Sequence, residues 1–143
     1  MRRRLEAQRA TSLRLYCSPY YANSAFYPII DNFGRALRFA RDDTAEQKLD
    51  KLEALIVGQY GRPREDLRFI AAILSIPGEE RYGAVAMTPQ KFKDETLGAL
   101  VDTTAAIARR QPTVMLFEDA HWADPTTLEV MDLLIHRVRP FRW

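Results

Sequence analysis

The sequence predicts an α/β protein with an incomplete parallel sheet of two strands and a predominantly helical middle. The first observation is a short apolar run, residues 114–117, which is followed directly by two acids and then by Asp124-Pro125. Such an unbroken run is typical of a strand buried on both faces in a parallel sheet. A second strand pattern covers residues 13–17, and the residues between the two strands carry helical periodicity.

The length and composition indicate a single globular domain. The chain has 143 residues, of which 47% are hydrophobic and 28% charged, so we expect one domain over residues 1–143. The net charge of +2 is too small to indicate nucleic-acid binding by itself. Arginines gather near both ends, and we interpret residues 2–10 as the solvated end of a helix rather than a nucleic-acid-binding arm or a transit signal.

Cysteine content and hydropathy predict the compartment. Cys17 is the single cysteine, so no intrachain disulfide can form and a reducing compartment is expected. No apolar segment approaches the ~20 residues that a membrane helix needs. The arginines at the start are followed by polar residues rather than by the apolar stretch of a signal peptide. Together these features predict a soluble, cytoplasmic protein with no membrane partner.

The first strand, residues 13–17, ends at Ser18-Pro19, and a helix then begins near Asn23-Ser24 or at Pro28. A proline is tolerated there because the N–H that it lacks would be unpaired in the first turn of a helix. Apolar residues at three- and four-residue spacing give this helix one apolar face, made of Phe26, Ile29, Ile30, Phe33, Leu37 and Ala40.

The next helix begins with a capping box. Thr44 and Gln47 can each satisfy a free backbone N–H at the start of a helix that ends near Gly58. Its expected buried residues recur at helical spacing and are Leu49, Leu52, Leu55 and Ile56.

A shorter helix follows a polar loop. The acids Glu65-Asp66 suit its first turn, because negative charge is favourable at a helix N-terminus. This helix ends before Pro77-Gly78, and residues 78–87 are predicted to form a loop.

The last two helices flank the second strand. Thr88 caps and Pro89 opens the longest helix, which ends before Pro112. Its expected inner face is Phe92, Thr96, Leu97, Leu100, Val101, Thr104, Ile107 and Ala108. After the strand, Asp124 caps and Pro125 opens a final helix, with the expected buried residues Leu128, Met131, Leu134, Ile135 and Val138.

The residues around the second strand resemble a known family. The segment Leu-Phe-Glu-Asp-Ala-His-Trp-Ala-Asp-Pro-Thr-Thr-Leu-Glu, residues 116–129, resembles the Walker B segment of AAA/STAND-type P-loop ATPases. It is most similar to the ATPase regions fused to class III adenylate cyclases, tandem kinases or transcription regulators in bacteria. Residues 15–28 and 47–55 resemble other parts of the same domain, so the resemblance covers roughly residues 12–138.

The resemblance implies roles for two adjacent acids. Glu118 and Asp119 would be the Walker B pair that holds Mg²⁺ on ATP, and Asp119 would be the catalytic acid that orients the attacking water. Their position agrees, because open α/β sheets bind ligands at the carboxyl ends of their strands. Glu118 departs from the commoner Asp at the Mg²⁺ position, and its extra methylene shifts the carboxylate outward. Without the resemblance, both residues are simply loop acids or helix caps.

The motif that would hold the phosphates is not found in these residues. A P-loop needs glycines, a lysine and a Ser or Thr to bind phosphate and Mg²⁺, and no lysine here directly follows a glycine. In the resembled family the P-loop stands upstream of the matching region, and a further strand follows the Walker B helix. We therefore expect an ATPase fragment that leaves residues 114–117 with an exposed apolar edge and does not hydrolyse ATP alone.

Other candidate residues have simpler interpretations. Zinc needs three or four ligands, so His121 and His136 do not predict a metal site, and His121 is expected at the surface or behind the acids. Cys17 is expected to be neutral and partly buried at a strand end. The aromatic residues between positions 16 and 27 would either stack on a base or pack around a helix start. Trp122 is expected in the core or in an interdomain contact.

Two classes of function follow. The first is a fragment of an ATP-binding and ATP-hydrolysing regulatory module of a signalling protein, whose nucleotide site is completed by missing segments or by a protein partner. The second is a helical protein–protein interaction module that binds no nucleotide. Nucleic-acid binding through the terminal arginines is a third and less favoured interpretation, which predicts steeply salt-dependent binding.

Overall fold

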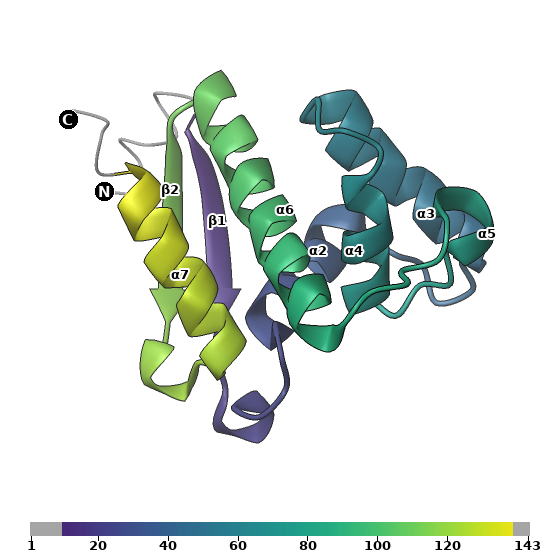
Figure 1. Cartoon of the computed structure of the whole chain (residues 1–143). Coiled ribbons are helices and arrows are strands. Elements are labelled where there is room, and N and C mark those ends of the chain that lie inside the picture. The colour runs from purple at the N-terminus through teal and green to yellow at the C-terminus, as the bar shows by residue number, and fades with distance from the viewer. Residues whose placement is uncertain (1–9, 139–143) are drawn as a thin grey trace. The chain divides into compact units, whose positions relative to one another are not determined.

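The computed structural model describes residues 10–138 (Figure 1). The helix end expected over residues 2–10 therefore lies almost wholly outside the described residues. The elements in chain order are β1 (Thr11–Tyr16), η1 (Pro19–Tyr21), α2 (Tyr27–Leu37), α3 (Ala45–Glu53), η2 (Ala54–Gln59), α4 (Asp66–Ile73), α5 (Glu79–Tyr82), α6 (Pro89–Arg110), β2 (Thr113–Glu118), η3 (Ala120–Trp122) and α7 (Pro125–Val138). The described chain forms two compact units: a sheet unit of residues 10–32 and 108–138, and a helical unit of residues 33–107.

The two strands pair in parallel, which confirms the predicted mixed α/β class. The register runs without interruption from Thr11 opposite Thr113 to Tyr16 opposite Glu118. Parallel strands need a long crossover connection, and here the helical stretch between the strands supplies it. The carboxyl ends of β1 and β2 consequently lie at the same end of the sheet (Figure 1).

The sheet is less buried than the sequence predicts. Leu15 of β1 is buried, whereas Tyr16 of β1 and Leu116 of β2 are each 38% exposed. The prediction that residues 114–117 are buried on both faces is therefore wrong. The physical reason is that the elements within residues 10–138 cover the faces of this two-stranded sheet only in part, and β2 has no second neighbouring strand there whose side chains would flank its own.

Helix α2 begins one residue before Pro28, close to one of the two predicted starts. Its Asn32 side-chain amide donates a hydrogen bond to the backbone oxygen of Arg14 at 3.2 Å, which ties the first turns of the helix to β1. The predicted apolar face extends to Ala40, and this end is wrong. The helix stops at Leu37 because Arg38 adopts a left-handed conformation with φ of 50°, as helix termini commonly do.

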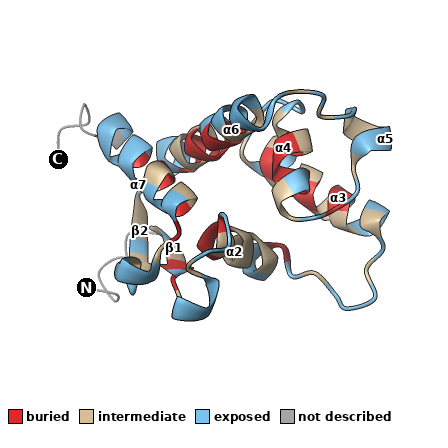
Figure 2. Ribbon diagram, turned by 60° about the horizontal axis from the view of Figure 1, so that its bottom comes forward, coloured by how far each residue is buried: buried red, intermediate tan, exposed pale blue. Residues whose placement is uncertain are grey.

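The helical unit contains the predicted capping box. The Gln47 N–H donates to Thr44 Oγ1 at 3.2 Å, and the Thr44 N–H donates to Gln47 Oε1 at 2.8 Å. After Glu53 the helix continues as the π-helical segment η2, in which the Tyr60 N–H donates to the Leu55 oxygen at 3.0 Å. This wider turn leaves Leu55 only half-buried, whereas the unit's fully buried core is made of Leu49, Leu52, Ile56, Leu67 and Ile70. Figure 2 shows buried stretches on α3 and α4.

The predicted loop over residues 78–87 contains a short helix, α5, so that prediction is wrong for its first half. Gly78 precedes the helix, and its backbone oxygen accepts a hydrogen bond from the Tyr82 N–H at 2.8 Å. The side chains of Arg81 and Tyr82 bind acids on α3. Contacts with α3 therefore hold a segment that is too short to be recognised as a helix from its own periodicity.

Helix α6 begins as predicted, with the Lys91 N–H donating to Thr88 Oγ1 at 3.2 Å. Its inner face is only partly as expected, because Phe92 and Thr104 are half-buried and Ala108 is exposed. Small residues are buried instead at three positions, Ala99, Thr103 and Ala106. Alanine and threonine carry too little hydrophobicity to mark a face by periodicity alone.

No helix within residues 10–138 is long and apolar enough to cross a membrane.

Helix α7 begins as predicted but buries a different face. Thr127, Val130 and Leu134 are buried, whereas the predicted core residues Leu128 and Ile135 are 47% and 54% exposed. Met131 is half-buried, and the side chain of Val138 lies outside the described residues. The helix contains more apolar residues than one face can bury, so periodicity could not select which of them meets the sheet.

Candidate functional site

The two predicted site acids lie at the carboxyl end of the sheet, where β2 ends and its connection to α7 begins. Glu118 is the last residue of β2, and its backbone oxygen accepts a hydrogen bond from the Cys17 N–H at 3.0 Å. Asp119 follows directly, and both acidic residues are exposed. The structure therefore places the predicted pair where open α/β sheets bind their ligands.

The backbone of Asp119 is unusual. It adopts a left-handed conformation with φ of 55° and ψ of 43°, which is uncommon for any residue other than glycine and is best tolerated by Asn and Asp. Its side chain makes no capping hydrogen bond to the following turn, η3. A capping role therefore does not account for this acid. Strained conformations of this kind gather at functional sites, although they do not by themselves identify one.

Asp124 is the polar centre of the site and is only 1% exposed. Its carboxylate accepts hydrogen bonds from the Thr127 N–H at 3.0 Å, from the Thr127 hydroxyl at 2.5 Å and from the Thr126 hydroxyl. These bonds confirm the predicted cap of α7. Burial alone would raise the pKa of Asp124, but the hydrogen bonds from both threonines and from the Phe26 N–H outweigh it and hold the pKa below its usual range.

The contact between Asp124 and Phe26 joins two loops that are far apart in the sequence. The Phe26 N–H donates to Asp124 Oδ2 at 3.1 Å and to Thr126 Oγ1 at the same distance. Phe26 is itself buried and left-handed, with φ of 60°. The β1–α2 loop and the β2–α7 loop are thereby fastened together beside the two acids. Sequence reasoning assigned Asp124 only a capping role, because no local pattern reveals a partner 98 residues away.

Cys17 is buried at the end of β1. Burial raises the pKa of its thiol, and the negative charges of Asp124 and Asp119 raise it further. The raised pKa disfavours a thiolate and agrees with the predicted neutral cysteine.

The aromatic residues near the site pack on one another. The rings of Tyr21 and Tyr27 are stacked, with centroids 3.7 Å apart and planes 8° apart. This contact favours packing around the helix start over stacking on a base. His121 and Trp122 are both exposed and contact each other with ring centroids 5.1 Å apart, so Trp122 is not a core residue of the sheet unit.

Residues 10–138 hold no cluster of three or more potential metal ligands.

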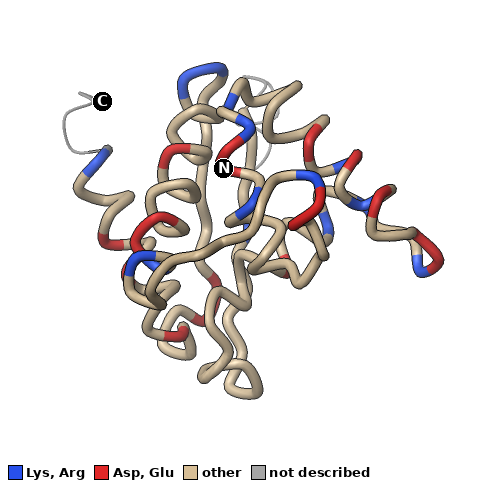
Figure 3. Tube along the Cα trace, turned by 45° about the vertical axis from the view of Figure 1, so that its right-hand side comes forward, with Lys and Arg blue, Asp and Glu red and all other residues tan. Residues whose placement is uncertain are grey.

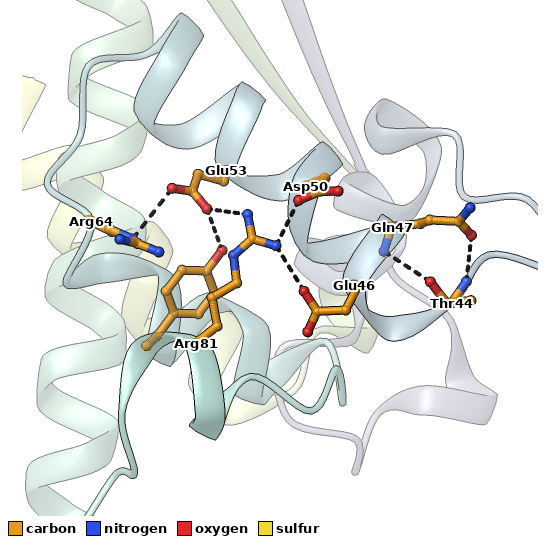
Figure 4. Close-up of polar contacts among 8 residues, drawn as sticks. Thr44, Glu46, Gln47, Asp50, Glu53, Arg64 and Arg81 are labelled. Atoms are coloured by element: carbon orange, nitrogen blue, oxygen red, sulfur yellow. Dashed lines mark hydrogen bonds and ion pairs between the residues drawn. The ribbon is translucent and has the colours of Figure 1, made fainter.

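A second polar cluster lies in the helical unit, and sequence reasoning missed it. Arg81 of α5 binds three acids of α3, with distances of 2.7 Å to Asp50, 2.7 Å to Glu53 and 3.3 Å to Glu46 (Figure 4). Tyr82 donates a further hydrogen bond to Glu53 at 2.9 Å. The sequence does contain a signal for this cluster. Glu46, Asp50 and Glu53 are four and three residues apart, which places them on one face of a helix, where a cation can bind all three.

The cluster borders an open groove of 760 Å³ between the starts of α3 and α5 and the end of α4. Its lining includes Arg68, whose Nε is buried and has no hydrogen-bond partner within the described residues. Arg81 also lines the groove, but its three acids already neutralise it. The groove is therefore lined by small apolar side chains, by the acids Glu46, Glu79 and Glu80, and by an arginine whose Nε has no hydrogen-bond partner among the described residues.

Comparison with known proteins supplies little further identification. No family model and no solved structure matches the chain. An uncharacterized protein of Rhizobium meliloti (strain 1021) is 24% identical over 131 residues, which cover 92% of this chain. The chain spans 12% of the length of that relative.

Proposed function

We propose that this chain is part of an ATP-binding regulatory module of the AAA/STAND type, as found in bacterial signalling proteins. In this module Glu118 and Asp119 supply the Mg²⁺ and water side of a nucleotide site. The observation that carries the proposal is the pair of exposed acids at the carboxyl end of a parallel strand, within a segment that resembles Walker B. The left-handed Asp119 and the buried Asp124 support it, because both indicate a loop of defined conformation.

The two acids suit Mg²⁺ and the chemically similar Mn²⁺. Mg²⁺ in phosphoryl-transfer sites is bound through one or two carboxylates, while substrate phosphates and water complete its coordination. Zinc and calcium sites require more protein ligands than this pair provides. Glu118 and Asp119 therefore fit the metal half of the proposed site.

The phosphate half is not supplied by these residues. No lysine directly follows a glycine in the sequence, so the chain holds no P-loop to surround a triphosphate. Because electrostatic binding of the triphosphate provides most of the catalysis in phosphoryl transfer, the chain alone is expected not to turn over ATP. When bound, ATP–Mg²⁺ would supply the transferable phosphoryl group and its neutralising charge.

The chain's own residues would act in three ways. Glu118, anchored at the strand end through its backbone bond to Cys17, would hold the metal. Asp119 would accept a hydrogen bond from the attacking water and orient it. Asp124 would act as a positioning residue, because it joins the two loops on which the acids depend.

The metal half of the proposal can be tested on the chain itself with Mn²⁺, which replaces Mg²⁺ and broadens nearby NMR signals. We expect the amides of Cys17, Glu118 and Asp119 to broaden first in a titration, and this selectivity to disappear in Glu118→Gln with Asp119→Asn. Asp132→Asn is the matched control, because that acid is exposed on α7. Equal broadening at Asp132 and at the site, or no effect of the double variant, would exclude a metal site.

The nucleotide half needs the DNA on both sides of the coding region. We expect a glycine-rich segment ending in Lys-Thr or Lys-Ser to be encoded upstream. A longer protein that includes it should hydrolyse ATP, with turnover lost in Glu118→Gln and retained in Asp132→Asn. Unrelated flanking sequence, or turnover that is unchanged in Glu118→Gln, would contradict the proposed function.

A protein–protein interaction module without nucleotide binding is the second candidate. The groove beside α3, α4 and α5 favours it, because the groove has small apolar lining residues and the incompletely satisfied Arg68. This candidate predicts that Mn²⁺ broadens no signal selectively. It also predicts that Arg68→Gln, rather than Glu118→Gln, abolishes partner binding.

A further inference from the structure

The outer edge of β2 presents regularly spaced hydrogen-bonding groups. The backbone oxygens of Pro112 and Glu118 accept hydrogen bonds from Thr11 and Cys17 at 2.8 and 3.0 Å, so even-numbered residues of the strand face β1. Because successive residues of a strand point in opposite directions, the N–H and C=O groups of Thr113, Met115 and Phe117 face outward. No strand within residues 10–138 pairs with them.

This edge lacks the features that natural proteins use to block strand addition. The strand interior, residues 114–117, contains no charge and no proline, and its register with β1 has no bulge. Bulges, prolines and charges on edge strands normally prevent pairing with another chain. The edge is therefore open to a further strand.

The charges at the two ends of β2 have opposite signs. Arg109 and Arg110, at the end of α6, precede the strand and are exposed. Glu118 and Asp119 end it and are also exposed. Figure 3 marks the basic and acidic positions along the chain trace. A second β2 laid antiparallel along the edge would bring each acidic end toward a basic end, whereas a parallel copy would bring like charges together.

Helix α7 also leaves apolar side chains exposed. Leu128 and Ile135 are seven residues apart, so they share one face, and both are exposed. In an antiparallel arrangement Leu128 of one copy would approach the Ile135 end of its partner.

We propose that the chain forms a homodimer through antiparallel pairing of β2 with β2 of a second copy. Only outward-facing residues can form hydrogen-bonded pairs across this edge, and each such pair exchanges two bonds. All three outward residues are paired when the two-fold axis passes beside Met115, which then pairs with Met115 of the second copy. Thr113 pairs with Phe117 of the second copy and Phe117 with its Thr113. The result is one four-stranded sheet with β1 at both outer edges.

This inference concerns the 143-residue chain by itself. It uses Glu118 and Asp119 only as negative charges at a strand end, so it needs no bound metal or nucleotide. The Mn²⁺ titration can be performed on the variant Arg109→Glu with Arg110→Glu, which keeps both acids. The outcome for the metal site and the outcome for the dimer are therefore separable.

The mass of the purified chain tests the dimer directly. Light scattering over a dilution series should show the mass doubling from 16.5 kDa as the concentration rises, with weaker association at high salt. A chain that stays monomeric at every concentration, at both low and high salt, overturns the proposal.

Two charge-reversed variants test the antiparallel orientation. The basic-end variant is Arg109→Glu with Arg110→Glu, and the acidic-end variant is Glu118→Lys with Asp119→Asn, which keeps a residue that tolerates the left-handed conformation. Each variant alone opposes like charges and is expected to be monomeric. Their equimolar mixture restores unlike charges at both ends and is expected to dimerise.

Misfolded variants could not restore association on mixing, so the mixture separates loss of folding from loss of the interface. Arg41→Glu is the matched control, because Arg41 is exposed in the helical unit, and it should leave dimerisation unchanged. Two monomeric variants whose mixture also stays monomeric would overturn the antiparallel arrangement.

Amide hydrogen exchange tests the register. In the dimer the amides of Thr113, Met115 and Phe117 should be protected together with their even-numbered neighbours. In the monomeric basic-end variant, only Val114, Leu116 and Glu118 should stay protected, because β1 still bonds them. A dimer in which Met115 exchanges as fast as it does in the monomer would exclude pairing through this edge.

Discussion

At the scale of single residues, Asp124 links several segments of the sheet unit. It caps α7, binds two threonine hydroxyls and holds the backbone of Phe26, all through one buried carboxylate. Removing it would leave several buried donors without a partner, and each unsatisfied buried donor is costly. A residue at the centre of such a network affects both the stability of the loops and the position of the two candidate acids.

We predict that Asp124→Ala destabilises the protein by about 2–4 kcal/mol, which combines the loss of a helix cap with unsatisfied buried donors. Urea unfolding measures the effect, and Asp132→Ala, at an exposed position of α7, is the matched control. An Asp124→Ala variant as stable as the control would show that the hydrogen bonds contribute little.

The lowered pKa of Asp124 also predicts an acid dependence. Its folded pKa lies below the unfolded value of about 3.9, so its contribution is complete above that pH and is lost as the pH falls through the folded pKa. We expect the urea midpoint of the wild type to fall more steeply below about pH 4 than that of Asp124→Asn. Parallel pH profiles would contradict this assignment.

Tyr82 gives the corresponding alkaline prediction. Burial, together with its hydrogen bond to Glu53, raises the pKa of Tyr82 to about 12. Its contribution to stability is therefore present below the unfolded value of about 10 and is lost as the pH rises through the folded value. Phenolate absorbance should show one tyrosine titrating near pH 12, absent in Tyr82→Phe. An unchanged titration curve in that variant would assign the late-titrating group to another tyrosine.

At the scale of elements, α5 is held by its side chains rather than by its length. Arg81 and Tyr82 attach it to the acidic face of α3. We predict that Arg81→Gln speeds amide exchange in residues 79–82 several-fold, because α5 loses its ion pairs with α3. Glu46→Gln should change it much less, since Glu46 is 70% exposed and Arg81 keeps two other partners.

The orientation of α7 has a similarly direct test. Leu134 is 8% exposed and Ile135 is 54% exposed, although the sequence suggests that both are core residues. We predict that Leu134→Ala costs about 2–5 kcal/mol, as buried leucines do. Ile135→Ala should change the unfolding free energy by less than about 0.5 kcal/mol. The variants are neighbours on one helix, so equal losses would show that the helix is rotated.

At the scale of the whole molecule, the two units differ in how their cores are built. The helical unit contains several apolar residues with no exposed surface, whereas the sheet within residues 10–138 has two strands, and each of them is an edge strand. Two-stranded sheets are only marginally stable alone. We predict that native-state hydrogen exchange opens β1 and β2 at lower free energy than α3 and α4. Equal opening free energies in the two units would contradict this.

The sequence by itself determined the features that depend on neighbours within one helical turn. The capping box at Thr44, the cap at Thr88 and the Asp124-Pro125 start all involve partners three residues away, so their hydrogen bonds can be predicted from spacing. The two strands, the α/β class and the adjacent acids could be predicted for the same reason, because a strand and the residues that end it are consecutive in the sequence.

Only the tertiary structure decided which faces are buried and which distant groups meet. Asp124 binds Phe26 across 98 residues, and Arg81 binds Glu53 across 28. Helix α7 has apolar residues around more of its circumference than the sheet can cover, so its buried face depends on what packs against it. Burial is a property of the assembled chain, because an apolar side chain is excluded from water only when a partner element covers it.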